Sequence, residues 1–151
     1  MTFRGQTGYV VGEFGTMFKT TDGGTTWNPV TLENKVSLMA IDFRTDNDGV
    51  AVGLAGTLMT TSDGGATWTL IPDLTREHLF DVHWYEDKWV VVGDKGVMIT
   101  SDAGAKNWTV GKIFEGDIAW RTQMVKAGAK SYVVGANLGI LEGGKLSIVG
   151  R

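Results

Sequence analysis

Three aspartates stand at the same place in a repeated segment, and their carboxylates could ligate a metal ion or act as catalytic acids. Asp22, Asp63 and Asp102 each follow a Thr or Ser and precede a glycine and then a tryptophan. A metal site or an acid/base pair needs its carboxylates within one small pocket. Residues that occur once per repeat of a fold lie far apart, so we predict no metal site and no catalytic role for them.

A structural role explains these aspartates better. A short acidic side chain accepts hydrogen bonds from the backbone of its own turn, and glycine takes the left-handed position there. The tryptophan that follows could stack on a sugar, but its fixed place after the turn favours packing against a sheet. We expect this structural role for Asp22, Gly24, Trp27, Asp63, Gly65, Trp68, Asp102, Gly104 and Trp108.

A second motif recurs at intervals of about 40 residues and defines the repeat. Gly8-Tyr-Val-Val-Gly12 returns as Gly49-Val-Ala-Val-Gly53, as Trp89-Val-Val-Val-Gly93 and as Tyr132-Val-Val-Gly135, the last with one extra residue in its turn. The chain has 22 glycines, two prolines, short runs of β-branched and aromatic residues, and no sustained helical pattern. These features predict an all-β protein built from stacked units.

The second repeat shows the four strands of one unit most clearly, and we expect them at 38–43, 50–53, 57–61 and 67–71. Four strands per repeat are typical of a β-propeller blade. We predict one domain of about four four-stranded blades, a half-propeller or a small propeller, with repeats near 1–34, 35–74, 75–115 and 116–151. The first repeat is expected to lack its innermost strand. A pair of glycines three residues apart, Gly53 and Gly56 in the second repeat, joins the second strand to the third. Such glycine pairs suit a tight hairpin whose positive-φ positions glycine fills.

Composition excludes several function classes. The formal net charge is −3, so no bulk field favours nucleic acid. No signal-peptide pattern and no apolar run long enough to cross a bilayer is present, so we expect a soluble chain without membrane insertion. The absence of cysteine leaves the compartment open. Strands rather than helices follow the glycine pairs, which argues against a phosphate site and predicts no cofactor.

The predicted innermost strands supply most of the binding candidates, because propellers bind ligands at the mouth of the channel that these strands line. Aligning 38–43, 79–84 and, more loosely, 119–124 gives two alternating sets. The apolar set is assigned to the core: Met39, Ile41, Phe43, Phe80, Val82, Trp84, Trp120 and Met124. The polar set is Asp42, Asp81, His83, Arg121 and Gln123. It forms either a ligand site or, as we favour, an inter-blade network in which Asp81 or Asp42 pairs with Arg121.

Two further residues complete the binding candidates. Arg44 belongs to the Phe43-Arg44 pair that precedes the second repeat's glycine motif, and Trp89 replaces the glycine that opens the second strand in the first two repeats. Trp89 is either an exposed interface anchor or, as we favour, packed against a neighbouring blade. His78 and His83 alone cannot make a metal site.

The repeats resemble bacterial neuraminidase, or Asp-box, repeats. The fuller pattern, Phe43-Arg44 followed by GVAVG, GTL and TTSDGGATW, is most similar to the photosystem II stability and assembly factor family and covers nearly the whole chain. The resemblance implies a seven-bladed propeller of about twice this length that acts as a non-enzymatic assembly factor, hence a protein-binding scaffold. Sialidase activity is not expected, because three tyrosines and five scattered arginines do not supply that site.

Open terminal blades would expose apolar faces. We therefore expect a homo-oligomer, a dimer completing a larger ring, or completion by another subunit. The main function hypothesis is a scaffold that binds a protein partner. The alternatives are a structural component of a larger particle, such as a phage virion, and a carbohydrate-binding module.

Overall fold

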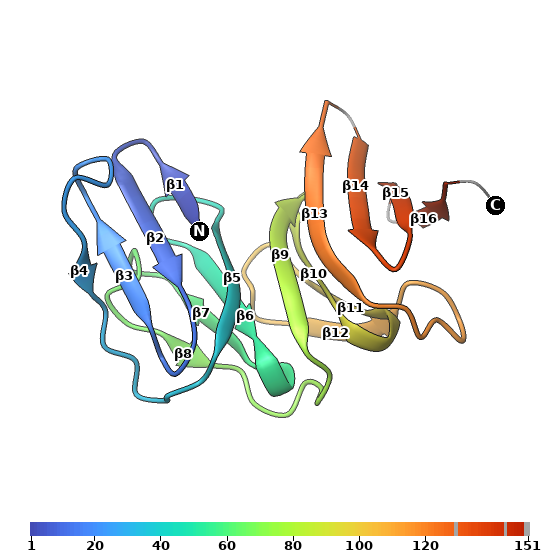
Figure 1. Cartoon of the computed structure of the whole chain (residues 1–151), viewed down its shortest axis with the longest axis horizontal. Coiled ribbons are helices and arrows are strands. Elements are labelled where there is room, and N and C mark those ends of the chain that lie inside the picture. The colour runs from blue at the N-terminus through green and yellow to red at the C-terminus, as the bar shows by residue number, and fades with distance from the viewer. Residues whose placement is uncertain (129, 144, 150–151) are drawn as a thin grey trace.

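Each repeat folds into one antiparallel four-stranded sheet, and the four sheets follow one another along an arc (Figure 1). The computed structural model describes residues 1–128, 130–143 and 145–149. The first two sheets contain β1 Thr2–Arg4, β2 Thr7–Val11, β3 Met17–Thr20, β4 Asn28–Pro29, β5 Leu38–Phe43, β6 Gly49–Gly53, β7 Leu58–Thr61 and β8 Thr69–Leu70. The other two contain β9 Leu79–Tyr85, β10 Lys88–Gly93, β11 Val97–Ser101, β12 Trp108–Lys112, β13 Arg121–Ala127, β14 Lys130–Gly135, β15 Leu138–Glu142 and β16 Lys145–Ile148.

The all-β prediction with four-stranded units is confirmed. One detail was wrong: the first sheet has its innermost strand, because Thr2–Arg4 pairs with β2 as β1. In every sheet the first strand of the repeat is innermost, and β1, β5, β9 and β13 lie nearest the centre of the arc (Figure 1).

The core lies between neighbouring sheets. Tyr9 of the first sheet stacks on Phe43 of the second, with ring centroids 4.3 Å apart, in a cluster that joins these two sheets. A second cluster, which includes Val50, Val91 and Trp89, joins the second and third sheets, and a third joins the third and fourth. No helix among the described residues is long and apolar enough to cross a membrane.

A bulge occurs at the start of the innermost strand in the second, third and fourth sheets. Gly53 pairs with Leu38, and the pairing then skips to Val52 with Ala40. A Cβ on Gly53 would collide with the carbonyl oxygen of Ser37, and Gly93 and Gly135 face His78 and Trp120 in the same way. The glycine that ends the second strand of each of these sheets is therefore needed, because the backbone of the bulged strand passes close to it.

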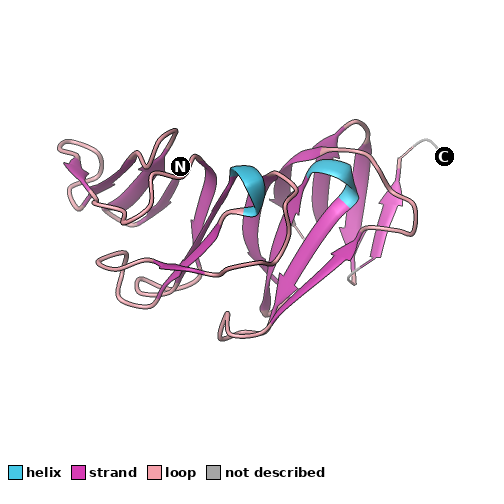
Figure 2. Ribbon diagram, turned by 90° about the horizontal axis from the view of Figure 1, so that it is seen from below, coloured by secondary structure: helices cyan, strands magenta, loops and turns pink. Residues whose placement is uncertain are grey.

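Positive φ is confirmed for the second glycine of the first three pairs, at Gly15, Gly56 and Gly96, and not for the first glycine. Gly53 and Gly93 are extended, with φ of −167° at each, so they do not use glycine's conformational freedom. The left-handed residues are Ala55 and Gly56 in one turn, and Lys95 and Gly96 in another. These residues belong to two short 3-10 helices, η1 Leu54–Gly56 and η2 Asp94–Gly96 (Figure 2).

The Asp-box aspartates order their own turns. Asp63 Oδ1 accepts hydrogen bonds from Thr61 Oγ1 at 2.8 Å and from the Thr67 backbone N–H at 2.9 Å, and Oδ2 accepts from Thr67 Oγ1 at 2.6 Å. The Thr67 bonds are the main reason that the pKa of Asp63 falls to about 2. The matching threonines lower the pKa of Asp22 to about 2, and the Lys106 backbone N–H lowers that of Asp102.

Candidate functional site

The inner side of the arc carries a groove of about 550 Å³ between the innermost strands β5, β9 and β13. Met39 and Phe80 supply apolar surface to it, and His83, Gln123 and Lys126 supply polar groups. Met39 is 48% exposed and Phe80 is half-buried, so both are open to the groove. Within the described residues no group of three or more His, Asp or Glu side chains could hold a metal ion.

The assignment of Met39, Phe80 and Trp120 to the core was wrong. The bulge shifts the alternation of β5, β9 and β13, so the residue just before or within it turns outward while its neighbour turns inward. Trp120 is 47% exposed, whereas Leu38 and Leu79 are buried. Beyond the bulge the alternation follows the prediction, and Ile41, Phe43, Val82 and Met124 are buried.

Asp42, His83 and Asp81 form a polar network at the edge of the groove. His83 on β9 lies between the two carboxylates, with Nδ1 3.6 Å from Asp42 Oδ2 and Nε2 3.3 Å from Asp81 Oδ2. Each carboxylate also binds the backbone of the following sheet. Asp42 Oδ2 accepts from the Trp84 N–H at 3.1 Å, and Asp81 Oδ2 accepts from the Met124 N–H at 2.6 Å.

The network continues into the first sheet and is charged at neutral pH. Thr2 Oγ1 on β1 donates to Asp42 Oδ1 at 3.3 Å, so one hydrogen-bonded series joins all four innermost strands. Hydrogen bonds to Asp42 and then to Asp81 raise the pKa of His83 to about 10, against the opposing effect of its burial. An imidazolium between two carboxylates therefore holds the second and third sheets together.

The alignment of the fourth repeat was two residues out of register. Arg121 pairs with Gly135 as Leu38 pairs with Gly53, so Arg121 occupies the place of a buried leucine. By the same pairing Gln123 corresponds to Asp81, and Val125 corresponds to His83. The spacing to the glycine that ends the second strand could have revealed this shift, because Arg121 lies 14 residues before Gly135, as Leu79 lies before Gly93.

Arg121 does not pair with Asp42 or Asp81, contrary to the favoured interpretation. It is fully buried, and its Nη2 lies 3.2 Å from Oδ2 of Asp117, which is also buried. Arg121 does not line the groove, whereas Gln123 is exposed and lines it. Arg121 is therefore a structural residue in this fold.

Arg44 and Trp89 lie at a second, smaller pocket of about 210 Å³ between the second and third sheets. Trp89 is 1% exposed and packs edge-on against Trp84, so the hypothesis of an exposed anchor is wrong. Arg44 covers the other ring: its guanidinium lies 4.9 Å from the Trp84 ring centroid and donates to Asp48 at 2.8 Å. The two candidates thus belong to a packed joint between sheets.

Sequence reasoning missed the apolar part of the groove, Met39 and Phe80, and its basic side chain, Lys126. A signal was present, because the glycine that ends each second strand marks a close approach by the innermost strand. A strand that comes this close to its neighbour is often bulged, and a bulge reverses the faces.

Comparisons with known proteins place this geometry among propellers. The sequence model of the family described as photosynthesis system II assembly factor YCF48 matches residues 30–116. A solved structure of YCF48 bound to D1 peptide is 23% identical, with a TM-score of 0.74, and the match covers 97% of this chain and 50% of that one. YCF48 from Cyanidioschyzon merolae is 18% identical, with a TM-score of 0.73 and coverages of 95% and 52%.

Enzymes share the same fold. An ancestral GH74 enzyme is 13% identical, with a TM-score of 0.77 and coverages of 95% of this chain and 22% of that enzyme. No curated protein matches the chain. The chain spans about half the length of the YCF48 structures it matches, and its architecture is that of a partial propeller.

Proposed function

We propose that this chain, which belongs to the family described as photosynthesis system II assembly factor YCF48, is a non-enzymatic module that binds a segment of a partner protein. The groove on the inner side of the arc is the binding site. The observation that carries this proposal is that the exposed Met39 and the half-buried Phe80 line the groove beside a fixed polar network on the innermost strands.

The chemistry of the groove suits an uncharged segment with apolar side chains. Asp42 and Asp81 carry two negative charges, and His83 and Lys126 carry two positive charges, so the groove has little net charge. Met39 and Phe80 offer apolar contact, and the exposed Thr122 and Gln123 offer polar groups to a bound backbone. Apolar centres with polar rims are typical of protein-binding surfaces.

The strands that line the groove are held in place before any partner arrives. Backbone N–H groups of Trp84 and Met124 bind the carboxylates of the preceding sheets, so the spacing of β5, β9 and β13 is fixed. A preformed site loses less conformational entropy on binding. The YCF48 structure that holds a D1 peptide supports the idea that a propeller of this family takes a peptide.

The same network argues against glycoside hydrolysis, although GH74 enzymes share the fold. A hydrolase of that type needs one carboxylic acid and one carboxylate that both reach the scissile bond. Here His83 lies between Asp42 and Asp81, and backbone N–H groups bind both carboxylates. The imidazole occupies the place where a glycosidic oxygen or a water would have to lie.

Selection from a displayed library of random peptides tests this function. We expect the immobilised chain to enrich peptides with apolar side chains and low net charge. Adding Phe80→Asp protein as a competitor should not displace the selected peptides, whereas wild-type protein should. A selection that enriches nothing above an uncoated surface would contradict the proposal.

A further inference from the structure

An aromatic joint connects the first and second sheets. In the second sheet, Phe43 and Trp68 meet edge to face, with centroids 6.0 Å apart and an interplanar angle of 86°. Tyr9 of the first sheet stacks on the open face of Phe43 at 4.3 Å and 16°. The Tyr9 hydroxyl donates to the Gly64 carbonyl oxygen at 2.5 Å, so the ring is fixed by both stacking and a hydrogen bond.

The first sheet has its own copy of the Phe43 and Trp68 pair on which the tyrosine stacks. Phe3 and Trp27 meet edge to face at 5.9 Å and 81°, which matches the Phe43 and Trp68 pair closely. Phe3 is 44% exposed, however, whereas Phe43 is 4% exposed. Within the part of the chain that the structure describes, no tyrosine stacks on Phe3. The first sheet therefore presents an exposed ring on which another aromatic side chain could stack.

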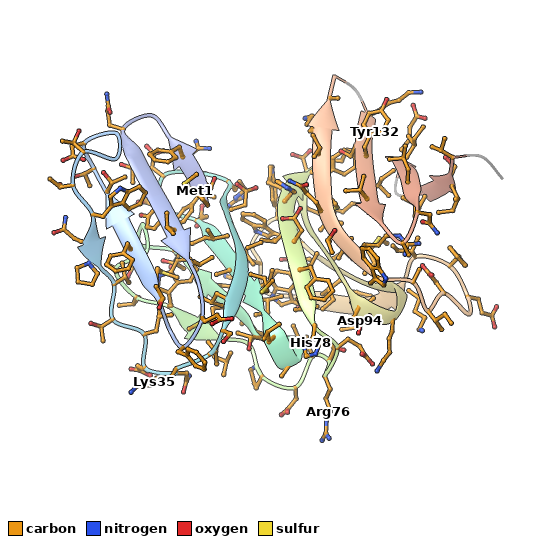
Figure 3. The ribbon with its side chains drawn as sticks, viewed as in Figure 1. Met1, Lys35, Arg76, His78, Asp94 and Tyr132 are labelled. Atoms are coloured by element: carbon orange, nitrogen blue, oxygen red, sulfur yellow. The ribbon has the colours of Figure 1, made fainter. Side chains whose placement is uncertain are left out.

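The fourth sheet carries a tyrosine, Tyr132, at the position that Tyr9 occupies in the first sheet. Tyr9 pairs with Thr2 and Lys19 across its sheet, and Tyr132 pairs with Val125 and Ile140 at the corresponding positions. The equivalent residues of the second and third sheets are valines, Val50 and Val90. Tyr9 is 3% exposed and Tyr132 is only half-buried. Tyr132 and Met1 lie on the sheets at opposite ends of the arc (Figure 3).

The surroundings of the two half-joints are apolar and exposed. Phe18 on the first sheet is 37% exposed, at the position where Met59 of the second sheet is buried. On the fourth sheet, Val125 is 47% exposed and Leu138 is 41% exposed. Faces with this composition are normally covered in a folded protein.

We propose that a second copy of this chain covers both faces. The fourth sheet of each copy packs on the first sheet of the other, and Tyr132 stacks on Phe3 of the second copy as Tyr9 stacks on Phe43. The Tyr132 hydroxyl donates to the Gly23 carbonyl oxygen of the second copy, the counterpart of Gly64. A second copy is the occupant that the geometry favours, because it carries both matching halves. Two such joints related by a two-fold axis close a ring.

Light scattering across a dilution series gives the first test. The chain has a mass of 16.3 kDa, and we expect twice that mass in solution. Phe3→Asp and Tyr132→Asp should each shift the protein to the monomer, while Val110→Asp, on the exposed outer strand β12, should leave the dimer intact. A wild-type monomer at every concentration, or a dimer that survives both changes, would overturn the proposal.

Crosslinking tests the orientation of the joint. The chain has no cysteine, so single cysteines can be placed as Phe3→Cys and Tyr132→Cys. In a mixed dimer one joint keeps its native Tyr132 and Phe3, while the other brings the two cysteines together. A short bismaleimide should link the mixture and should link neither variant alone. Linking of either variant with itself, or no linking of the mixture, would contradict the head-to-tail arrangement.

This inference does not rest on the proposed function, although Val125 lies at both the groove and the proposed joint. A wild-type protein that is monomeric and still binds the selected peptide would overturn the proposed joint and leave the proposed function intact. A dimer that binds no peptide would overturn the proposed function and leave the joint intact.

Discussion

His83 on β9 and Asp42 on β5 face each other across the boundary between the second and third sheets, with Nδ1 3.6 Å from Oδ2. The same imidazole reaches Asp81 on its own strand at 3.3 Å. This arrangement fixes the edge of the groove and makes its stability depend on pH.

Replacing His83 with Gln should remove a pH-dependent part of the free energy of unfolding. The pKa of His83 is raised from 6.5 to about 10 in the folded chain. The unfolded chain therefore releases this proton first, and the stabilisation is full below about pH 6.5 and is lost as pH rises through about 10. Urea unfolding of both proteins between these values should show a wild-type advantage that shrinks with pH. An advantage that stays constant would show that His83 is not charged in the fold.

At the Asp-box turns the pH dependence of stability should have the opposite sign, with stability lost in acid. The pKa of Asp63 is lowered from 3.8 to about 2, so its stabilisation is present above 3.8 and is lost as pH falls through about 2. Asp63→Asn should therefore unfold at a higher pH than wild type in an acid titration followed by tryptophan fluorescence. Asp46→Asn provides the control, because the Asp46 side chain is 89% exposed and pairs with Arg4 rather than with the Asp-box turn. Equal acid midpoints for all three proteins would contradict the assigned role.

Gly53 and Gly12, which end the repeated glycine motif of the second and first repeats, should respond very differently to substitution by alanine. A Cβ on Gly53 collides with the Ser37 carbonyl oxygen, whereas a Cβ on Gly12 meets nothing closer than Thr16 Cβ at 3.6 Å. We expect Gly53→Ala to lower the free energy of unfolding by about 3 kcal/mol, because the bulged backbone cannot move aside easily. Gly12→Ala should be close to neutral. Chemical denaturation of the two variants measures the difference, and similar costs would rule out the bulge as the reason for the glycine.

The sequence predicted the repeat, the strands and the Asp-box turns, because these features are local. Turn chemistry and period-two alternation act within a few residues, so they can be read along the chain. Period-two alternation does not reveal the bulge, because the bulge depends on how closely Ser37 passes Gly53 on the neighbouring strand, and the glycine is its sign in the sequence. One extra residue in that strand was enough to move Met39 and Phe80 from the predicted core to the groove.

Arg121 shows a second limit of the sequence. It follows a loosely matching segment, and the pairing with Gly135 shows that it replaces a leucine. The residue that neutralises it, Asp117, lies in the loop before β13 and carries no repeat signal. In contrast, Asp42, Asp81 and His83 were found because polar residues interrupting apolar strands need partners when they are buried.

The buried pair of Arg121 and Asp117 should be costly to break singly and cheap to replace as a unit. Arg121→Leu leaves the Asp117 carboxylate buried without its cation, which typically costs about 3 to 5 kcal/mol. Adding Asp117→Asn removes that charge and keeps an acceptor for the Ala119 N–H. Arg121 Nε has no hydrogen-bond partner among the described residues, so the double variant also removes an unsatisfied group. Urea unfolding should place the double variant close to wild type, and an equally unstable double variant would contradict this view.

The affinity of a library-selected peptide for three proteins tests the central claim, protein binding in the inner groove, most directly. Isothermal titration calorimetry would compare wild type with Phe80→Asp in the groove and Val110→Asp on the outer strand β12, both of which place a charge on an accessible apolar side chain. A hot-spot residue at the centre of an interface costs about 2 kcal/mol or more when truncated, which exceeds the roughly 1.4 kcal/mol of a tenfold loss of affinity. We predict at least that loss for Phe80→Asp and unchanged affinity for Val110→Asp. Equal affinities for wild type and Phe80→Asp would place the partner elsewhere on the propeller and contradict the account.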